Sequence, residues 1–124
     1  MKTTFKTIFT IFGLTLLMTS CEYGYDYTYT LTNKTDSQIK VYVKTFRIDS
    51  IYTIAKDSTE ILFITDHGIE GSKGPYFANV TEDLDKFTVT INETSVSKRD
   101  YLKNESWTFT KGDYSTIVTN NEFK

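Results

Sequence analysis

The stretch YGYDYTYTLT at positions 23–32 decides the fold, because large side chains occupy every second position in it. Its odd-numbered positions hold four tyrosines and Leu31, whereas its even-numbered positions hold a glycine, an aspartate and three threonines. A β-strand places alternate residues on opposite faces, and tyrosine and threonine favour strands. The stretch therefore predicts a strand whose tyrosine-bearing face is buried.

The same period-two pattern recurs along the chain and predicts further short strands. The residues Asn33–Asp36 supply turn chemistry, so the first two strands are expected to pair as a hairpin. Residues 66–74 contain three glycines and are expected to form a loop. The further expected strands are 39–46, 48–54, 59–65, 76–80, 87–92, one opening at Trp107, and 114–119.

Seven or eight short strands at roughly ten-residue spacing are typical of an all-β sandwich. The expected fold is an antiparallel β-sandwich of Ig-like architecture over residues 25–124, with a small β-barrel as the alternative. No apolar run with a helical period reaches about ten residues after Cys21, which argues against a helical domain.

The first 20 residues have the layout of a secretory signal. Lys2 and Lys6 make a positive start, and the apolar run Ile8–Met18 follows. This run has 11 residues, whereas crossing a bilayer needs about 20. Cys21 is the only cysteine of the chain, so it has no disulfide partner within it.

The residues Leu17-Met18-Thr19-Ser20-Cys21 resemble the lipobox of bacterial lipoproteins, and Met18 departs from the leucine preferred at its position. The chain also resembles small lipoproteins of Bacteroidota-type envelopes in its relaxed lipobox and its Tyr/Thr/Asn-rich strands. The resemblance implies removal of residues 1–20 as a signal peptide, acylation of Cys21, and a short tether over 21–24. It also implies an address in the cell envelope, anchored in the outer membrane and facing the periplasm or the cell surface.

Charge and composition restrict the partners and the chemistry. The chain has 14 Lys+Arg and 16 Asp+Glu, and removal of Lys2 and Lys6 with the signal leaves a formal charge of −4. This balance argues against nucleic acid as a partner. His67 is the only histidine, with no nucleophile motif beside it, so it is expected in a solvated loop. We expect no enzyme activity, no cofactor and no metal site.

The acidic residues Glu82, Asp83 and Asp85 lack the spacing of an EF-hand. They are interpreted as the solvated start of a helical turn, where carboxylates are favoured, and calcium binding stays open.

Aromatic residues outside the first strand are candidates for a ligand face, because exposed rings stack on sugars and on protein partners. Two tripeptides, Asp49-Ser50-Ile51 and Asp57-Ser58-Thr59, resemble an O-glycosylation motif of exported Bacteroidota-type proteins, which implies Ser50 and Ser58 as acceptors. The residues expected on the ligand face are Tyr42, Phe46, Tyr76 and Trp107.

The expected function is that of a membrane-anchored envelope lipoprotein whose sandwich is a non-catalytic binding or structural module. The partner would be the membrane, through the lipid, together with a protein or a glycan. Two alternatives are an inhibitor or immunity-type lipoprotein that blocks a toxin or enzyme, and a carbohydrate-binding surface lipoprotein.

Overall fold

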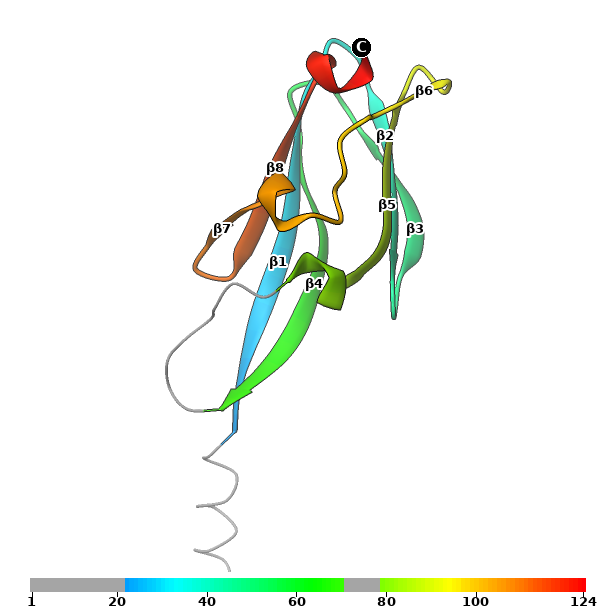
Figure 1. Cartoon of the computed structure of the whole chain (residues 1–124). Coiled ribbons are helices and arrows are strands. Elements are labelled where there is room, and N and C mark those ends of the chain that lie inside the picture. Colours follow the sequence, from blue (N-terminus) through cyan, green and yellow to red (C-terminus); the bar gives the residue numbers. More distant parts are fainter. Residues whose placement is uncertain (1–21, 71–78) are drawn as a thin grey trace, which may run out of the picture.

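The computed structural model describes residues 22–70 and 79–124, which form an all-β sandwich (Figure 1). Cys21 and Tyr76 lie outside these residues. The elements are β1 (Glu22–Lys34), β2 (Ile39–Thr45), β3 (Asp49–Ile54), β4 (Thr59–Glu70), η1 (Val80–Glu82), β5 (Leu84–Ile91), β6 (Ser95–Val96), η2 (Asn104–Ser106), β7 (Thr108–Thr110), β8 (Asp113–Thr119) and η3 (Asn120–Phe123).

Two four-stranded sheets make up the two layers. Sheet A has the order β4-β1-β8-β7, and sheet B has the order β3-β2-β5-β6. The sheets do not close on each other, so the sandwich is confirmed and the barrel alternative is wrong. Pairing is antiparallel except between β1 and β8, which run parallel. The expectation of a wholly antiparallel fold is therefore corrected at one strand pair.

The core lies between the sheets and is built from the alternating positions of their strands. The tyrosine-bearing face of β1 is buried as predicted, because Tyr27, Tyr29 and Leu31 have no exposed surface. The ring of Tyr29 stacks on Phe63 and on Tyr114, with centroids 4.4 and 4.6 Å away. Such ring pairs add to the hydrophobic gain of burial, so β1 holds the centre of the core.

The expected hairpin between the first two strands is wrong, because β1 and β2 belong to different sheets. The backbone of Asn33 bonds instead to the turn before β4, accepting from Asp57 N at 2.8 Å and donating to Ser58 O at 2.9 Å. Turn residues at positions 33–36 predict that the chain changes direction, but they do not predict to which sheet the next strand belongs. Here the chain crosses from sheet A to sheet B.

The side chain of Asn33 holds this crossing and is fully buried. Its Nδ2 donates to the carbonyls of Ser37 and Ile54 at 2.9 and 3.0 Å. Its Oδ1 accepts from the backbone N and the Oγ1 of Thr35, at 3.0 and 2.7 Å. A buried amide that uses both its donor and its acceptor atoms fixes the path of the chain.

Several strand ends differ from the expected ones. β1 begins at Glu22, inside the expected tether 21–24, and β4 runs to Glu70 where a glycine-rich loop was expected from Asp66. The two strands pair from Glu22↔Glu70 to Thr32↔Thr59. Cross-strand hydrogen bonding therefore extends β4 through Gly68, which local sequence marks as a breaker. Of the expected strand 76–80, only Asn79 and Val80 are among the described residues. Asn79 precedes η1 and Val80 is its first residue, so neither lies in a strand.

Candidate functional site

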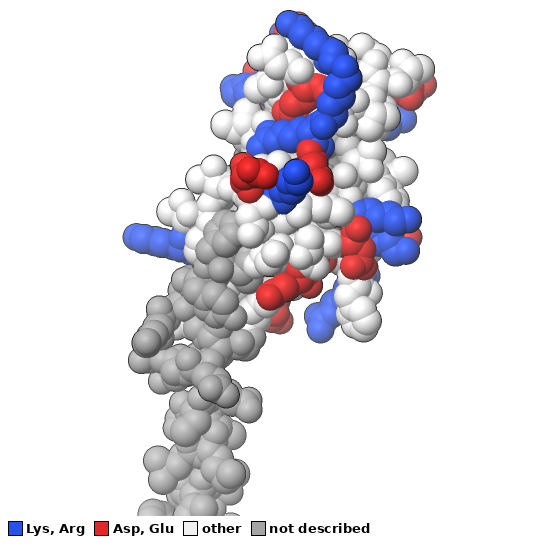
Figure 2. Space-filling view, in the orientation of Figure 1, with Lys and Arg blue, Asp and Glu red and all other residues white. Residues whose placement is uncertain are grey.

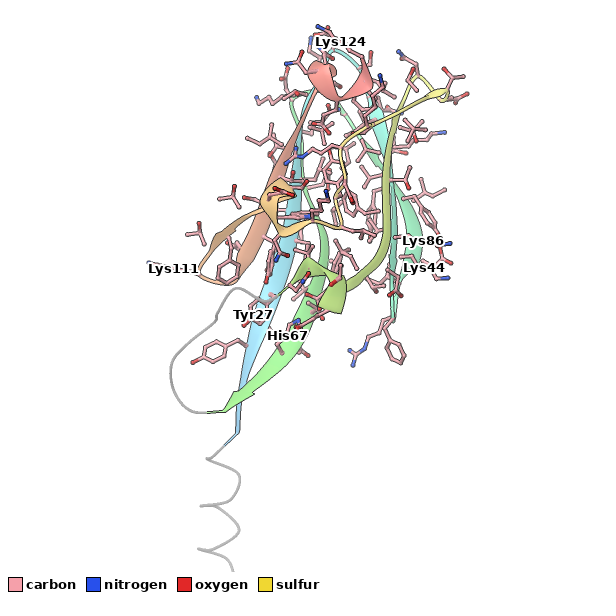
Figure 3. The ribbon with its side chains drawn as sticks, viewed as in Figure 1. Tyr27, Lys44, His67, Lys86, Lys111 and Lys124 are labelled. Carbon is pink, nitrogen blue, oxygen red and sulfur yellow. The ribbon has the colours of Figure 1, made fainter. Side chains whose placement is uncertain are left out.

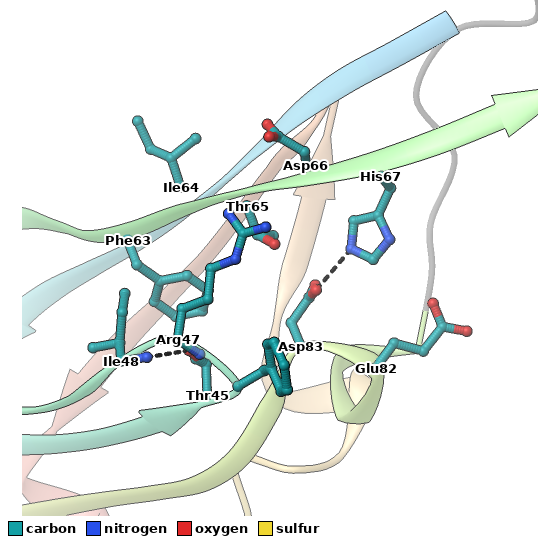
Figure 4. A pocket seen from close by; sticks show the side chains of 11 residues that line it. Thr45, Arg47, Ile48, Phe63, Ile64, Thr65, Asp66, His67, Glu82 and Asp83 are labelled. Carbon is teal, nitrogen blue, oxygen red and sulfur yellow. Dashed lines mark hydrogen bonds and ion pairs between the residues drawn. The ribbon is translucent and has the colours of Figure 1, made fainter. Parts of the chain in front are cut away.

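A cleft of ≈ 270 Å³ opens at one side of the sandwich (Figure 4). Its walls are residues 45–48 at the tip of the β2–β3 hairpin, residues 63–67 of β4, and Glu82 with Asp83 at the end of η1. The two sheets contribute opposite walls, because β4 is an edge of sheet A and the hairpin belongs to sheet B. Segments far apart in the sequence therefore meet at this cleft.

Asp83 is the centre of the polar network in the cleft. Its side chain is only 5% exposed, and both of its oxygens are engaged. The hydroxyl of Tyr29 donates to Oδ2 at 2.6 Å, and His67 Nε2 lies 2.7 Å from Oδ1. The carboxylate needs a donor at each oxygen, so it favours a proton on Nε2 of His67. A buried acid with two short bonds orients the histidine firmly.

His67 is held from a second side by the core. Alternation along β4 turns the ring inward, where it meets Tyr27 edge-on with centroids 4.8 Å apart. The side chain of His67 is 18% exposed, so the expectation of a solvated loop histidine is wrong. The expectation of a solvated Asp83 is also wrong. Strand β4 extends farther than its local sequence indicates, and this extension brings His67 to η1.

The cleft wall also carries carboxylates that face solvent. Asp66 lies directly across from Asp26 on β1. The hydrogen bond to Asp66 and the like charge of that carboxylate raise the pKa of Asp26. Asp66, Glu82 and Asp83 outnumber Arg47, the one arginine or lysine among the described residues that line the cleft. The cleft therefore presents mostly negative charge.

The described residues that line the cleft include one histidine, one arginine, two threonines and three acids. No serine or cysteine stands among the described residues of this lining, and Thr45 Oγ1 accepts from the backbone N of Arg47 and of Ile48 at 3.2 and 3.0 Å. Across residues 22–70 and 79–124 no group of three His, Cys, Asp or Glu side chains could hold a metal ion. The arrangement places a fixed histidine–carboxylate pair beside apolar side chains.

The residues expected to form one ligand face are separated in the structure. Trp107 is only 6% exposed and packs in the core, so its assignment to a surface is wrong. Phe46 is 96% exposed at the hairpin tip and forms part of the cleft wall. Tyr42 lies on β2, on the outer face of sheet B. Tyr76 lies outside the described residues.

The two serines with the glycosylation-like motif are both accessible at one edge of the sandwich. Ser50 is exposed on β3, and Ser58 is partly exposed in the turn before β4. Their modification stays a prediction.

Sequence reasoning missed Tyr29 and Asp83 as site residues. The pair is separated by 54 positions, and no local pattern links a core tyrosine to an acid in an acidic turn. The alternation of β1 indicated that Tyr29 points inward, but a buried hydroxyl needs a partner that only the tertiary structure supplies.

Comparisons of the chain with protein-family models, with curated proteins and with solved structures find no match. In the part of the chain that the structure describes, no helix is long and apolar enough to cross a membrane.

The network at Asp83 leads to a prediction about alkaline pH. Burial, followed by the hydrogen bond to Asp83, raises the pKa of Tyr29 above its ordinary value of 10.0. Burial and the bond to Glu122 raise the pKa of Tyr101 in the same way. Above pH 10 the unfolded chain therefore holds fewer protons than the folded chain, and stability falls as the pH rises.

We expect the free energy of unfolding to fall by roughly 1.4 kcal/mol per pH unit for each of these tyrosines once the pH exceeds about 10. Urea unfolding between pH 8 and pH 11 measures this slope. The variant Tyr29→Phe should remove the contribution of one tyrosine to this slope. The double variant Tyr29→Phe/Tyr101→Phe should remove the contributions of both. An unchanged slope in the double variant would contradict the prediction.

Proposed function

We propose that this chain is an envelope lipoprotein, anchored through acylated Cys21, whose sandwich is a non-catalytic binding module. The observation that carries the proposal is the position of Cys21. It is the sole cysteine, it follows the apolar run and the small residue Ser20, and it immediately precedes Glu22, the first residue of β1. A lipid on Cys21 would hold the sandwich against the membrane, because strand β1 starts at the very next residue.

The architecture supports a binding module that folds without a disulfide bond. All other positions lack cysteine, so the sandwich is held by non-covalent contacts and not by a disulfide. The binding role is supported by the cleft, where the highly exposed Phe46 stands beside the fixed His67–Asp83 pair. Charges of both signs are scattered over the face shown in Figure 2, so no single charged field covers that face.

The replacement Cys21→Ser tests the anchoring. We expect the variant to leave the membrane fraction and to lack the mass of the acyl chains, because serine cannot accept the thioether-linked lipid. Its thermal unfolding in solution should match that of the parent, since Cys21 precedes the first strand. Fractionation, intact mass and a thermal melt are the three measurements.

The matched control is Ser20→Ala, which keeps a small residue before the cysteine and should stay membrane-bound with its lipid. A Cys21→Ser protein that remained in the membrane fraction after washing at high pH would refute the anchoring proposal.

A further inference from the structure

The outer face of sheet B carries an alternating set of cations and one aromatic ring. Ile39, Val41 and Val43 of β2 point into the core, so the residues between them face outward. The outward residues are Lys40, Tyr42 and Lys44. Sequence reasoning singled out only Tyr42 among them.

Two lysines on this face stand directly opposite each other. Lys44 on β2 pairs with Lys86 on β5, and both lie on the same side of the sheet (Figure 3). Like charges directly opposite on neighbouring strands destabilise a sheet. Among the described residues no ion pair joins either lysine to an acid, whereas Lys40 lies 3.6 Å from Glu93. The lysine pair therefore presents two positive charges that no described acid meets in a direct ion pair.

An acid lies on the other side of Lys44, and its carboxylate bonds to Tyr42. Asp49 lies opposite Lys44 on β3, but its carboxylate accepts the hydroxyl of Tyr42, and this bond raises the pKa of Tyr42. The same bond restrains the ring of Tyr42 on the sheet surface. A ring that is already held in place loses little freedom when a ligand stacks on it.

A shallow hollow of ≈ 410 Å³ lies beside the ring. It is lined by Lys40, Tyr42, Ile51, Thr90 and Glu93. Ile51 lies opposite Tyr42 and is 66% exposed, so an apolar surface adjoins the ring. The face thus combines the restrained ring of Tyr42, the apolar Ile51 and the lysine pair on three neighbouring strands, β3, β2 and β5.

We propose that this face, made of Tyr42, Lys44, Ile51 and Lys86, binds an anionic glycan whose sugars carry carboxylate or sulfate groups. The sugar ring stacks on Tyr42 and fills the hollow, and an acidic substituent lies between the two lysines. An anion there removes the repulsion between Lys44 and Lys86, which is the charge complementarity that selects this ligand class. A flat bilayer would meet the lysines but leave the hollow unfilled. The proposal rests on the binding role of the sandwich and does not depend on acylation of Cys21.

The test is a binding titration of the mature chain, kept soluble in an uncharged detergent, with three probes: oligogalacturonate, heparin oligosaccharide and neutral dextran. We expect the two acidic probes to bind and dextran to bind far more weakly. Lys44→Gln/Lys86→Gln and Tyr42→Ala should each weaken binding by about tenfold or more, as expected for loss of a charge-assisted contact or a stacked ring. The control Lys103→Gln/Lys111→Gln removes the same charge from exposed positions off this face and should change affinity less than about twofold.

A melt without ligand separates a binding role from a structural one. Lys86→Gln should raise the Tm by about 1–5 °C, because it removes a like-charge pair, and it should still weaken binding. A lowered Tm would instead mean that Lys86 supports the fold. Equal losses in the control variant, no binding of either acidic probe, or binding only to phosphatidylglycerol vesicles would overturn the proposal. Because detergent replaces the membrane, these outcomes are independent of the Cys21→Ser test.

Discussion

Replacing Trp107 by alanine is expected to lower the free energy of unfolding by about 3–5 kcal/mol, the usual cost of removing a large ring from a core. The indole lies edge-on to Tyr29 and Phe87, with centroids 5.3 and 5.4 Å away. Its Nε1 donates to the carbonyl of Tyr101 at 2.8 Å. Alanine would leave a cavity between the sheets and an unpaired carbonyl, so both the packing and the hydrogen bond are lost.

Urea unfolding followed by far-UV circular dichroism measures this effect. Trp107→Phe keeps part of the ring volume and should cost clearly less than the alanine variant. Phe46→Ala is the matched surface control, because Phe46 is almost fully exposed, and it should change stability by less than about 0.5 kcal/mol. A Trp107→Ala protein of parental stability would mean that the indole lies at the surface, as the sequence suggested.

Replacing Asn33 by alanine is expected to cost about 3–5 kcal/mol, because several buried groups lose their partners at once. The carbonyl of Ile54 and the backbone N of Thr35 are both bonded to the Asn33 side chain. Each buried group left without a partner costs about 1–3 kcal/mol. This loss is a large fraction of the 5–15 kcal/mol typical of a domain, so the variant should unfold at a much lower urea concentration.

Asn120 provides a control of the same residue type in the same region. Its amide donates to Asp36 Oδ2 at 2.9 Å, and Oδ1 accepts from the backbone N of Asp36 at 3.1 Å, but both bonds are exposed. Asn120→Ala should therefore cost no more than about 1 kcal/mol, since water replaces the lost partners. Similar losses of stability in Asn33→Ala and Asn120→Ala would contradict the prediction, because burial of the Asn33 hydrogen bonds would then add nothing to stability.

Most strands could be predicted because alternation is a local property. The residues 23–32 repeat with period two, and burial of Tyr27 and Tyr29 follows from that repeat. Strand partners could not be predicted in this way. β1 lies between β4 and β8, and it runs parallel to β8, with Thr28 opposite Asp113. Pairing depends on contacts between distant segments, about which the alternation of one strand carries no information.

The candidate site was visible only in part. Tyr42 and Phe46 were singled out for their aromatic rings and both are accessible, but Trp107 carries the same chemistry and is buried. Residue type alone cannot separate a core ring from a surface ring, because aromatic side chains favour strands on either face.

The sequence by itself determined the strand-rich character and the inward-facing tyrosines of β1, since both depend on neighbouring residues. Only the tertiary structure decided that β1 and β2 enter different sheets and that Tyr29 and His67 meet at Asp83. The physical reason is the same in both cases. Buried polar groups must find hydrogen-bond partners, and for Asn33 and Asp83 some of those partners lie on segments distant in the sequence. Cross-strand register likewise placed Lys44 beside Lys86, a pair of charges that no local pattern predicts.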